Sequence, residues 1–309
     1  AALWMALLAG VLSLVAGRSL PPVSMPTPAA WALAGGWLFG TGAALNGGCS
    51  LSTLHRLADG ELGMLATLVG FALGVVLWAV SQAVLRAHPG VLPPGELMPV
   101  PTVWARWPAL APWLLFALGL WAMMRLRTLR RLARSSTSTS IRGRLLAPHY
   151  HLTVAAALLG LAGGALYATQ GAWSYTNHLR ASVLHAWWGS RAPEITHSAL
   201  VMALALGMVV SALQRGSIAW RRPQEALAWL RHTGGGMLMG AGAAMVPGGN
   251  DTLLLNALPT LALQAIGAYA AMLGGIAMVL WLMRRTQMPM PLTHCTEAGC
   301  AEVRPPIVP

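Results

Sequence analysis

The sequence has few charged residues and no lysine. Asp, Glu, Lys and Arg make up 9% of its 309 residues, whereas 56% are hydrophobic and the mean hydropathy is +0.60. A soluble globule of this size needs far more polar surface than such a composition supplies. The shortage of charge therefore excludes a soluble globular domain and predicts a chain that lies in a lipid bilayer.

Acidic residues are especially scarce, and none occurs between Glu96 and Glu194. All 20 basic residues are arginine, and the net charge is +12. The densest group, in a Ser/Thr-rich connection after an apolar run, consists of Arg125, Arg127, Arg130, Arg131, Arg134, Arg142 and Arg144. Arginine in a short loop marks the cytoplasmic side of a membrane. The distribution therefore favours a membrane protein and argues against nucleic-acid binding.

Cysteine is almost absent, which excludes a disulfide framework. Cys49 is isolated and free for thiol chemistry, while Cys295 and Cys300 lie in a polar tail next to His294. The tail pair could bind a metal or form a reversible disulfide, although a metal site normally needs four ligands; a disordered tail is the alternative. Cys-x-x-Cys-His, Walker, dinucleotide and HExxH patterns are missing. We therefore expect no metal and no cofactor.

Apolar runs provide the predicted membrane helices. A helix needs about 20 residues to cross the hydrocarbon layer, and suitable runs occupy 1–17, 62–85, 108–124, 152–169, 198–214 and 264–283. Two further runs, 29–45 and 235–246, are short and rich in glycine. The fold class is therefore all-α and polytopic. The segment 172–188 is interpreted as an aromatic belt at the membrane surface, with Trp173, Tyr175, Trp187 and Trp188.

The arginine rule also orients the remaining segments. It places 215–231, Arg284 and Arg285 inside, and it places 87–106 and 172–197 outside. If both glycine-rich segments entered and left on one side, the last helix would end outside with Arg284 and Arg285. We therefore expect that one broken segment crosses the membrane, or that the two halves are inverted, as transporter repeats often are.

The two glycine-rich runs repeat one another at a constant offset of 200 residues. Gly35, Gly36, Gly40, Gly42, Gly48 and Gly74 recur as Gly235, Gly236, Gly240, Gly242, Gly248 and Gly274. Small residues at this spacing let membrane helices pack closely. Short, interrupted segments at equivalent positions of two halves also indicate a binding site. We predict two re-entrant broken-helix units around a central pore.

In the first unit the glycines lead into Asn46, Gly47, Gly48, Cys49 and Ser50. Consecutive glycines would unwind the chain, and a helix restarting near Ser50 would direct its positive end at the gap, which favours an anion. A thiol is a polarizable, weak hydrogen-bond donor suited to a soft sulfur atom. Cys49 could instead be a small buried apolar residue, the usual role of a free cysteine.

The second unit makes the same break with different groups. It contains Gly248, Gly249, Asn250 and Asp251, and Gly249 takes the place of Cys49. Asn250 offers amide donors to a solute. Asp251 is an ionisable group at membrane depth, which is a candidate for function, but it could equally cap the helix over 253–255.

The paired patterns resemble the YeeE/YedE family of bacterial inner-membrane proteins. Residues 30–80, with GGWLFGTGAALNGGCSLSTLHRLADGELG, and residues 231–282, with GGGMLMGAGAAMVPGGNDTLLLNALP, carry the resemblance. It implies thiosulfate uptake, a pore cysteine at Cys49, and a cytoplasmic sulfur-carrier protein as partner. Thiosulfate-transporting relatives also have a cysteine in the second loop and one near the N-terminal end, whereas this chain has Gly249 or Asn250 in the loop and no cysteine in 1–48.

We therefore predict a multi-pass inner-membrane permease for a small sulfur-containing anion, thiosulfate first, rather than an enzyme. The alternatives are a different sulfur or selenium species, or a membrane sulfurtransferase that forms a persulfide on Cys49, with His55 as base. The predicted segments are 1–107 as the first half, 108–148 as a helix with the arginine-rich loop, 149–285 as the second half and 286–309 as the tail. The predicted substrate pathway consists of Asn46, Gly47, Gly48, Cys49, Ser50, Gly248, Gly249, Asn250 and Asp251.

Overall fold

Helices make up most of the computed structural model. The structure describes the chain except for residues 17–22, 27–28, 88–96, 101–110, 135–151, 172, 224, 247, 260–261, 288–292, 297–298 and 303–309. The helices are α1 Ala2–Ala16, α2 Ala29–Asn46, α3 Ser50–Ala58, α4 Gly63–Ala87, α6 Ala111–Arg134, α8 Leu152–Gln170, α9 Tyr175–Trp188, α10 Ile195–Arg215, α11 Ala226–Met245, α12 Gly249–Thr252 and α13 Leu263–Arg285. A π-helical turn, η2 Leu253–Ala257, follows α12 directly.

Short strands form two antiparallel pairs. They are β1 Val23–Pro26 with β2 Leu97–Val100, and β3 Thr293–Thr296 with β4 Gly299–Glu302. The second pair sets the backbone of Cys295 opposite that of Cys300. The connection 135–148, with Arg142 and Arg144, lies outside the described residues. The prediction of an all-α, polytopic membrane protein is confirmed.

Four of the described helices are long and apolar enough to span a membrane. Their qualifying segments are Gly63–Leu85, Thr153–Gln170, Ile195–Arg215 and Gln264–Arg285. The predicted run 1–17 gives a shorter apolar helix, Ala2–Leu12. The run 108–124 falls in α6, whose later turns contain Arg125 and Arg127. Large apolar side chains on the outer face of α4 are exposed at a spacing of three or four residues, as lipid-facing side chains would be: Leu65, Val69, Leu73, Leu77, Val80 and Val84.

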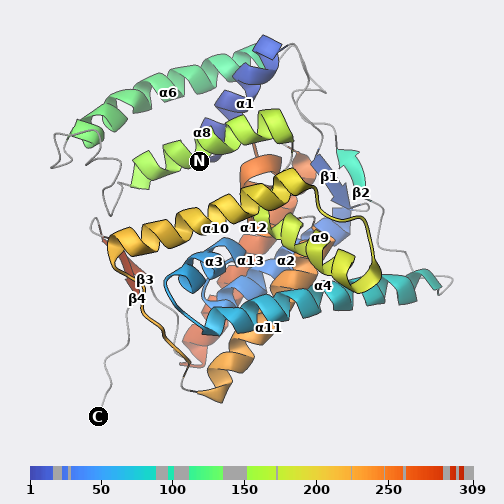
Figure 1. Cartoon of the computed structure of the whole chain (residues 1–309). Coiled ribbons are helices and arrows are strands. Elements are labelled where there is room, and N and C mark those ends of the chain that lie inside the picture. Colours follow the sequence, from blue (N-terminus) through green and yellow to red (C-terminus); the bar gives the residue numbers. More distant parts are fainter. Residues whose placement is uncertain are drawn as a thin grey trace.

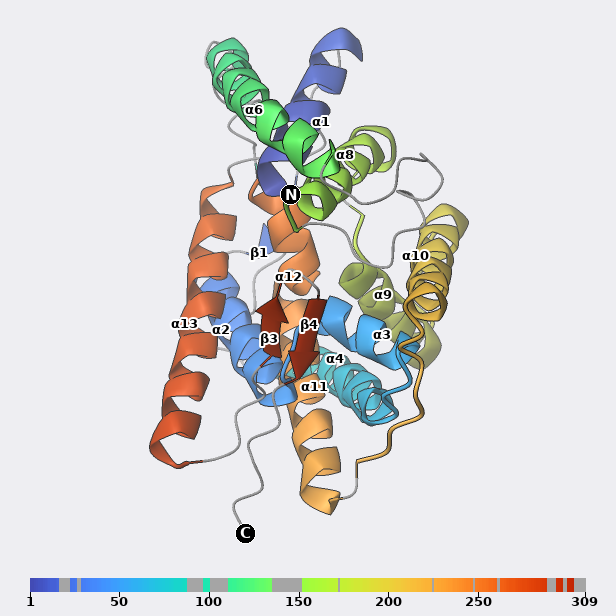
Figure 2. The ribbon, with the colours of Figure 1, turned by 90° about the vertical axis from the view of Figure 1, so that its left-hand side faces the viewer.

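The helices fall into two groups (Figures 1 and 2). In Figure 2, α13, α2, α11 and α4 lie side by side in that order, and each contacts the next. The helices α1, α6 and α8 form a second group on one side of this row. The central row holds the two glycine-rich segments, α2 and α11.

The two glycine-rich helices pack in opposite directions at their glycines. A Cβ atom on Gly42 would lie 2.5 Å from the carbonyl oxygen of Gly235, and one on Gly242 would lie 2.6 Å from that of Gly35. Residue numbers therefore rise along α2 as they fall along α11. At these separations any side chain would force the two backbones apart, so glycine is required.

Each glycine-rich helix also packs in parallel against a long helix of the other half: α2 against α13, and α11 against α4. A Cβ atom on Gly40 would lie 2.0 Å from the carbonyl oxygen of Met272 in α13, and one on Gly240 would lie 2.0 Å from that of Phe71 in α4. These are the helix directions that inverted halves would have. They place the end of α13 beside the end of α2, where Met283 packs with Ala44. The membrane side of Arg284 and Arg285 stays a prediction. Entry and return of either loop within the bilayer stays a prediction.

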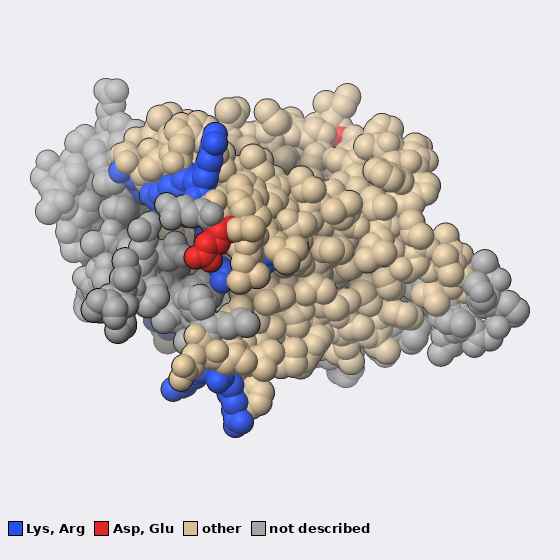
Figure 3. All heavy atoms as spheres, turned by 90° about the horizontal axis from the view of Figure 1, so that it is seen from below, with Lys and Arg blue, Asp and Glu red and all other residues tan. Residues whose placement is uncertain are grey.

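A charged clasp of Arg56, Asp59, Glu61, Arg215 and Arg221 joins the α3–α4 corner to the connection between α10 and α11. Arg215 Nη2 lies 2.8 Å from Asp59 Oδ1, and Arg56 Nη2 lies 2.6 Å from Glu61 Oε2. Three backbone hydrogen bonds of 2.9–3.0 Å join the same two segments. Figure 3 shows charged residues gathered at one end of the face it presents, the end at which α4 begins and α10 finishes. By the arginine rule, we expect this end to be cytoplasmic.

Candidate functional site

The first glycine loop interrupts the helix between α2 and α3. Gly47 has φ +78, a left-handed conformation that glycine adopts without strain. Cys49 is extended, with φ −76 and ψ 177, and α3 begins at the next residue, Ser50. The first N–H groups of α3 have no partners within the helix, so a positive helix end lies beside Cys49.

Asn46 holds this loop from behind. Its Nδ2 donates to the Gly48 carbonyl at 3.1 Å and to Thr53 Oγ1 at 3.0 Å. Its Oδ1 accepts from Thr67 Oγ1 at 2.7 Å and lies 2.9 Å from His232 Nδ1. The side chain is fully buried, with 0% of the residue exposed. Asn46 therefore joins the loop to α4 and to α11 of the other half.

The second glycine loop is closed by neighbouring side chains. Gly248 has φ +103 and Gly249 has φ +62. A Cβ atom on Gly249 would lie 2.5 Å from the nearest carbon of the Phe39 ring. The ring therefore occupies the space that a side chain at position 249 would need. This packing explains in physical terms why the second loop has no thiol where the first has Cys49.

Asp251 binds α9 rather than a solute cavity. Its Oδ2 accepts from the backbone N–H of Thr176 at 3.0 Å, and its Oδ1 accepts from the Thr176 hydroxyl and from the Thr252 N–H, the latter at 3.1 Å. Thr252 Oγ1 donates to Ser174 Oγ, the cap of α9, at 2.5 Å. A carboxylate beside free N–H groups at a helix start is favourable. Asp251 thus fastens the second loop to the start of α9, a partner that the sequence did not suggest.

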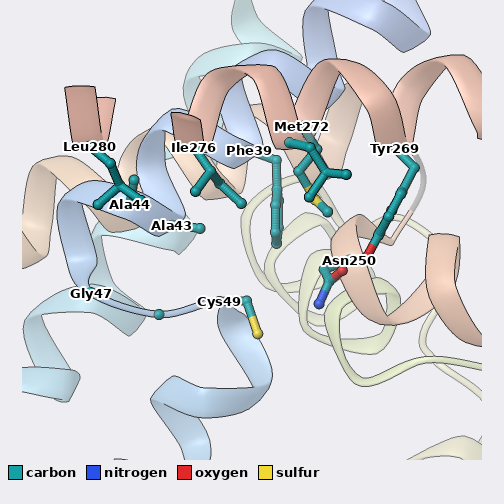
Figure 4. Close-up of a pocket in the computed structure, with 12 residues that line it drawn as sticks. Phe39, Ala43, Ala44, Gly47, Cys49, Asn250, Tyr269, Met272, Ile276 and Leu280 are labelled. Atoms are coloured by element: carbon teal, nitrogen blue, oxygen red, sulfur yellow. The ribbon is translucent and has the colours of Figure 1, made fainter. Parts of the chain in front are cut away.

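A cavity of about 320 Å³ lies between the first loop, α2 and α13 (Figure 4). Its lining residues are Phe39, Ala43, Ala44, Gly47, Gly48, Cys49, Asn250, Tyr269, Met272, Leu273, Ile276 and Leu280. Of the predicted pathway residues, Gly47, Gly48, Cys49 and Asn250 line it. Asn46, Ser50, Gly248, Gly249 and Asp251 do not. Asn46 and Asp251 make hydrogen bonds behind the loops, whereas the buried Ser50 hydroxyl has no partner among the described residues.

Sequence reasoning missed the whole α13 wall of this cavity. Tyr269, Met272, Ile276 and Leu280 are spaced so that they share one face of the helix. The helix is apolar all round, however, and hydropathy alone does not separate a cavity-facing side from a lipid-facing one. The hydroxyl of Tyr269 was the available signal, because it is a polar group within a predicted span.

The cavity is mostly apolar, and its described lining residues provide three polar side chains: the Cys49 thiol, the Asn250 amide and the Tyr269 hydroxyl. None of these described lining residues is charged. An anion here would be stabilised by uncharged donors and by the positive end of α3. The arrangement suits a small solute that has both a soft part and a hydrogen-bonding part.

His55 lies at the other end of α3 from Cys49. Its Nδ1 lies 3.4 Å from Asp59 Oδ2, and its Nε2 lies 3.2 Å from Arg215 Nη1. These contacts join His55 to two residues of the charged clasp and give no support to a Cys49–His55 nucleophile and base. Within the described ranges, the structure shows no group of three or more His, Cys, Asp or Glu side chains that could hold a metal.

A family model described as sulphur transport matches residues 1–278. No curated protein matches the chain. The match covers most of the sequence, so the chain belongs to this sulphur transport family, and the resemblance to YeeE/YedE proteins is confirmed. Together with its apolar helices, this membership identifies a multi-pass membrane transporter for a sulfur compound.

Proposed function

We propose that this protein carries a small sulfur-containing anion, with thiosulfate as the first candidate, through the cavity beside Cys49. The supporting observation is that Cys49 and Asn250, from two loops about 200 residues apart, line one cavity. Its volume of about 320 Å³ is at the low end of the usual ~300–1,000 Å³ for ligand sites, so it suits a small solute. We place the protein in the bacterial inner membrane, with the charged clasp inside.

The thiol supplies the sulfur selectivity in this proposal. A thiol donates weakly and is polarizable, so it interacts better with a terminal sulfur atom than with a strongly hydrated oxygen. The apolar walls around it also penalise any oxygen that loses its water without gaining a donor. A cytoplasmic sulfur-carrier protein is the proposed recipient at the clasp end.

Uptake of radiolabelled thiosulfate by cells that lack other sulfur permeases tests the proposal. We expect the intact protein to restore uptake, and we expect Cys49→Ala to lower its initial rate about tenfold, equivalent to ~1.4 kcal/mol, the size of one hydrogen bond. Cys295→Ala is the matched control, because it removes a thiol beyond the family match and should leave uptake unchanged.

Two results would contradict parts of this proposal. Equal uptake by the intact protein and Cys49→Ala would remove the thiol from the mechanism, and failure of the intact protein would point to another sulfur or selenium species.

Mass spectrometry distinguishes a transporter from the alternative, a membrane sulfurtransferase. In a sulfurtransferase the Cys49 thiolate would attack the outer sulfur of thiosulfate, the S–S bond would break with release of sulfite, and a persulfide would stay on Cys49; a transporter would release the solute unchanged.

A further inference from the structure

Tyr269 is the polar residue of the cavity that no sequence pattern indicated. It projects from α13, and its half-buried ring packs against two apolar clusters, one containing Ala268 and the other containing Phe39 and Met272. Figure 4 shows its hydroxyl directed toward Asn250 at one end of the cavity. Packing on both sides fixes the ring, so the hydroxyl has a defined position.

Within the described residues the structure shows no hydrogen bond of the Tyr269 hydroxyl or of the Asn250 side-chain amide, and both residues are half-buried. A hydroxyl offers one donor and an amide offers two. A polar group that is not bonded within the protein is open to water or to a ligand. Because both groups line the cavity, they are available to whatever occupies it.

The opposite end of the cavity has a different character. Ala44, Ile276 and Leu280 lie at that end in Figure 4, and the Cys49 sulfur lies between them and Asn250. The cavity therefore has a hydrogen-bonding end and an apolar end, and the Cys49 thiol lies between them. An occupant with two unlike ends would be bound in one orientation.

We propose that Tyr269 determines substrate specificity by donating, together with the Asn250 amide, to the oxygen-bearing end of an anion whose soft end contacts Cys49. This inference rests on the proposed function and assigns the residues that bind the sulfonate-like head of the anion. Sulfate has four equivalent oxygen atoms. It would direct some of them at apolar walls, where an unpaired polar group is unfavourable, so the site selects against it.

Binding to the purified full-length protein, measured by isothermal titration calorimetry, tests this inference. The two probes are thiosulfate, which has a sulfonate-like head and a terminal sulfur, and methanesulfonate, which has the same head and a methyl group. We expect Tyr269→Phe to weaken both by a similar factor of about ten, since one hydrogen bond to a charged group is lost. Cys49→Ala should weaken thiosulfate and leave methanesulfonate unchanged.

Two further variants keep the result interpretable. Met278→Leu changes an exposed residue of the same helix and should alter neither affinity. Asn250→Asp keeps the side-chain shape but introduces a carboxylate at the head-binding end, so it should abolish detectable binding of both probes. Unchanged thermal unfolding of each variant shows that the fold is retained.

The outcomes separate the two proposals. If the intact protein binds no thiosulfate, the proposed function fails. If it binds thiosulfate and Tyr269→Phe binds both probes as tightly, the function stands and the role of Tyr269 is wrong. A loss with Tyr269→Phe that affects thiosulfate alone would also overturn the inference, because the shared head would then not be the group that Tyr269 recognises.

Discussion

The loops after α2 and α11 share a glycine break but have opposite surroundings. The first loop is held from behind by Asn46 and faces an open cavity with Cys49. The second is covered by the Phe39 ring at Gly249 and is fastened to α9 through Asp251. The same glycine break therefore lines a cavity in the first half and attaches the loop to a neighbouring helix in the second half.

The helix α9 accounts for much of this difference. It packs against α4, α11 and α12. At the offset of 200 residues, these elements correspond to α13, α2 and the start of α3, which are the elements around the cavity. Its Leu179, Val183 and Leu184 join the apolar cluster that contains Met239 and Phe71. In the second half α9 thus fills the place that corresponds to the cavity in the first. Two halves with the same glycine repeat can therefore differ in whether the loop faces a cavity, because α9 packs over the elements of the second half.

Among the substitutions that test this difference between the two loops, we expect Asn46→Ala to have the largest effect on stability. The change removes the acceptor of Thr67 and His232 and the donor to Thr53 and the Gly48 carbonyl, all near the buried centre of the row. Each buried group left without a partner is unfavourable by about 1–3 kcal/mol, and we expect the free energy of unfolding to fall by roughly 3–5 kcal/mol in total.

Denaturant unfolding of the purified protein measures the Asn46→Ala effect. Ser81→Ala is the control, because it removes an exposed hydroxyl bonded only to its own helix and should change stability by less than about 0.5 kcal/mol. A small effect at Asn46, similar to the control, would show that the loop does not need this support.

Gly249→Cys tests whether the second loop can be made like the first. The left-handed φ of +62 disfavours a side chain by about 1–2 kcal/mol, and the contact with Phe39 adds to this. We expect a loss of roughly 2–4 kcal/mol, within the usual range for overpacking plus backbone strain. Gly207→Cys, where nothing lies within 4 Å of the new Cβ atom, should be tolerated. Equal stability of the two variants, compared by thermal unfolding, would contradict the role given to Phe39.

The close packing of the glycine-rich helices could be predicted from the sequence because it requires glycine at the contact positions. Glycines at positions such as Gly35 and Gly235 have no side chain, and the structure places backbone atoms within 3.1 Å of the Cβ position at both. The break at Gly47 follows from the same property. These features depend on residues that are close in sequence or repeated at a fixed offset.

The α9 contacts and the α13 wall could not be predicted in the same way. Asp251 and Thr176 are 75 residues apart, and nothing near either residue indicates the pairing. The aromatic-belt interpretation fits the exposed Trp187 and Trp188, but it is wrong for Tyr175, which is 6% exposed at the start of α9. Composition identifies an apolar or aromatic segment, whereas tertiary packing decides which of its faces is buried.

The smallest effect on stability is expected for Asp251→Asn. This variant shows whether Asp251 only attaches the second loop to α9 or also takes part in transport. The amide keeps the shape but has only one acceptor oxygen, so its NH2 group faces the N–H of either Thr176 or Thr252, and one charge-assisted interaction is lost at about 1.5–3 kcal/mol. We expect a lower unfolding midpoint, with thiosulfate uptake per folded molecule nearly unchanged because Asp251 does not line the cavity. Glu194→Gln is the matched control, since Glu194 precedes α10 without a side-chain cap bond. If Asp251→Asn stopped uptake at normal stability, the carboxylate would belong to the transport path and the second loop would not be only an anchor.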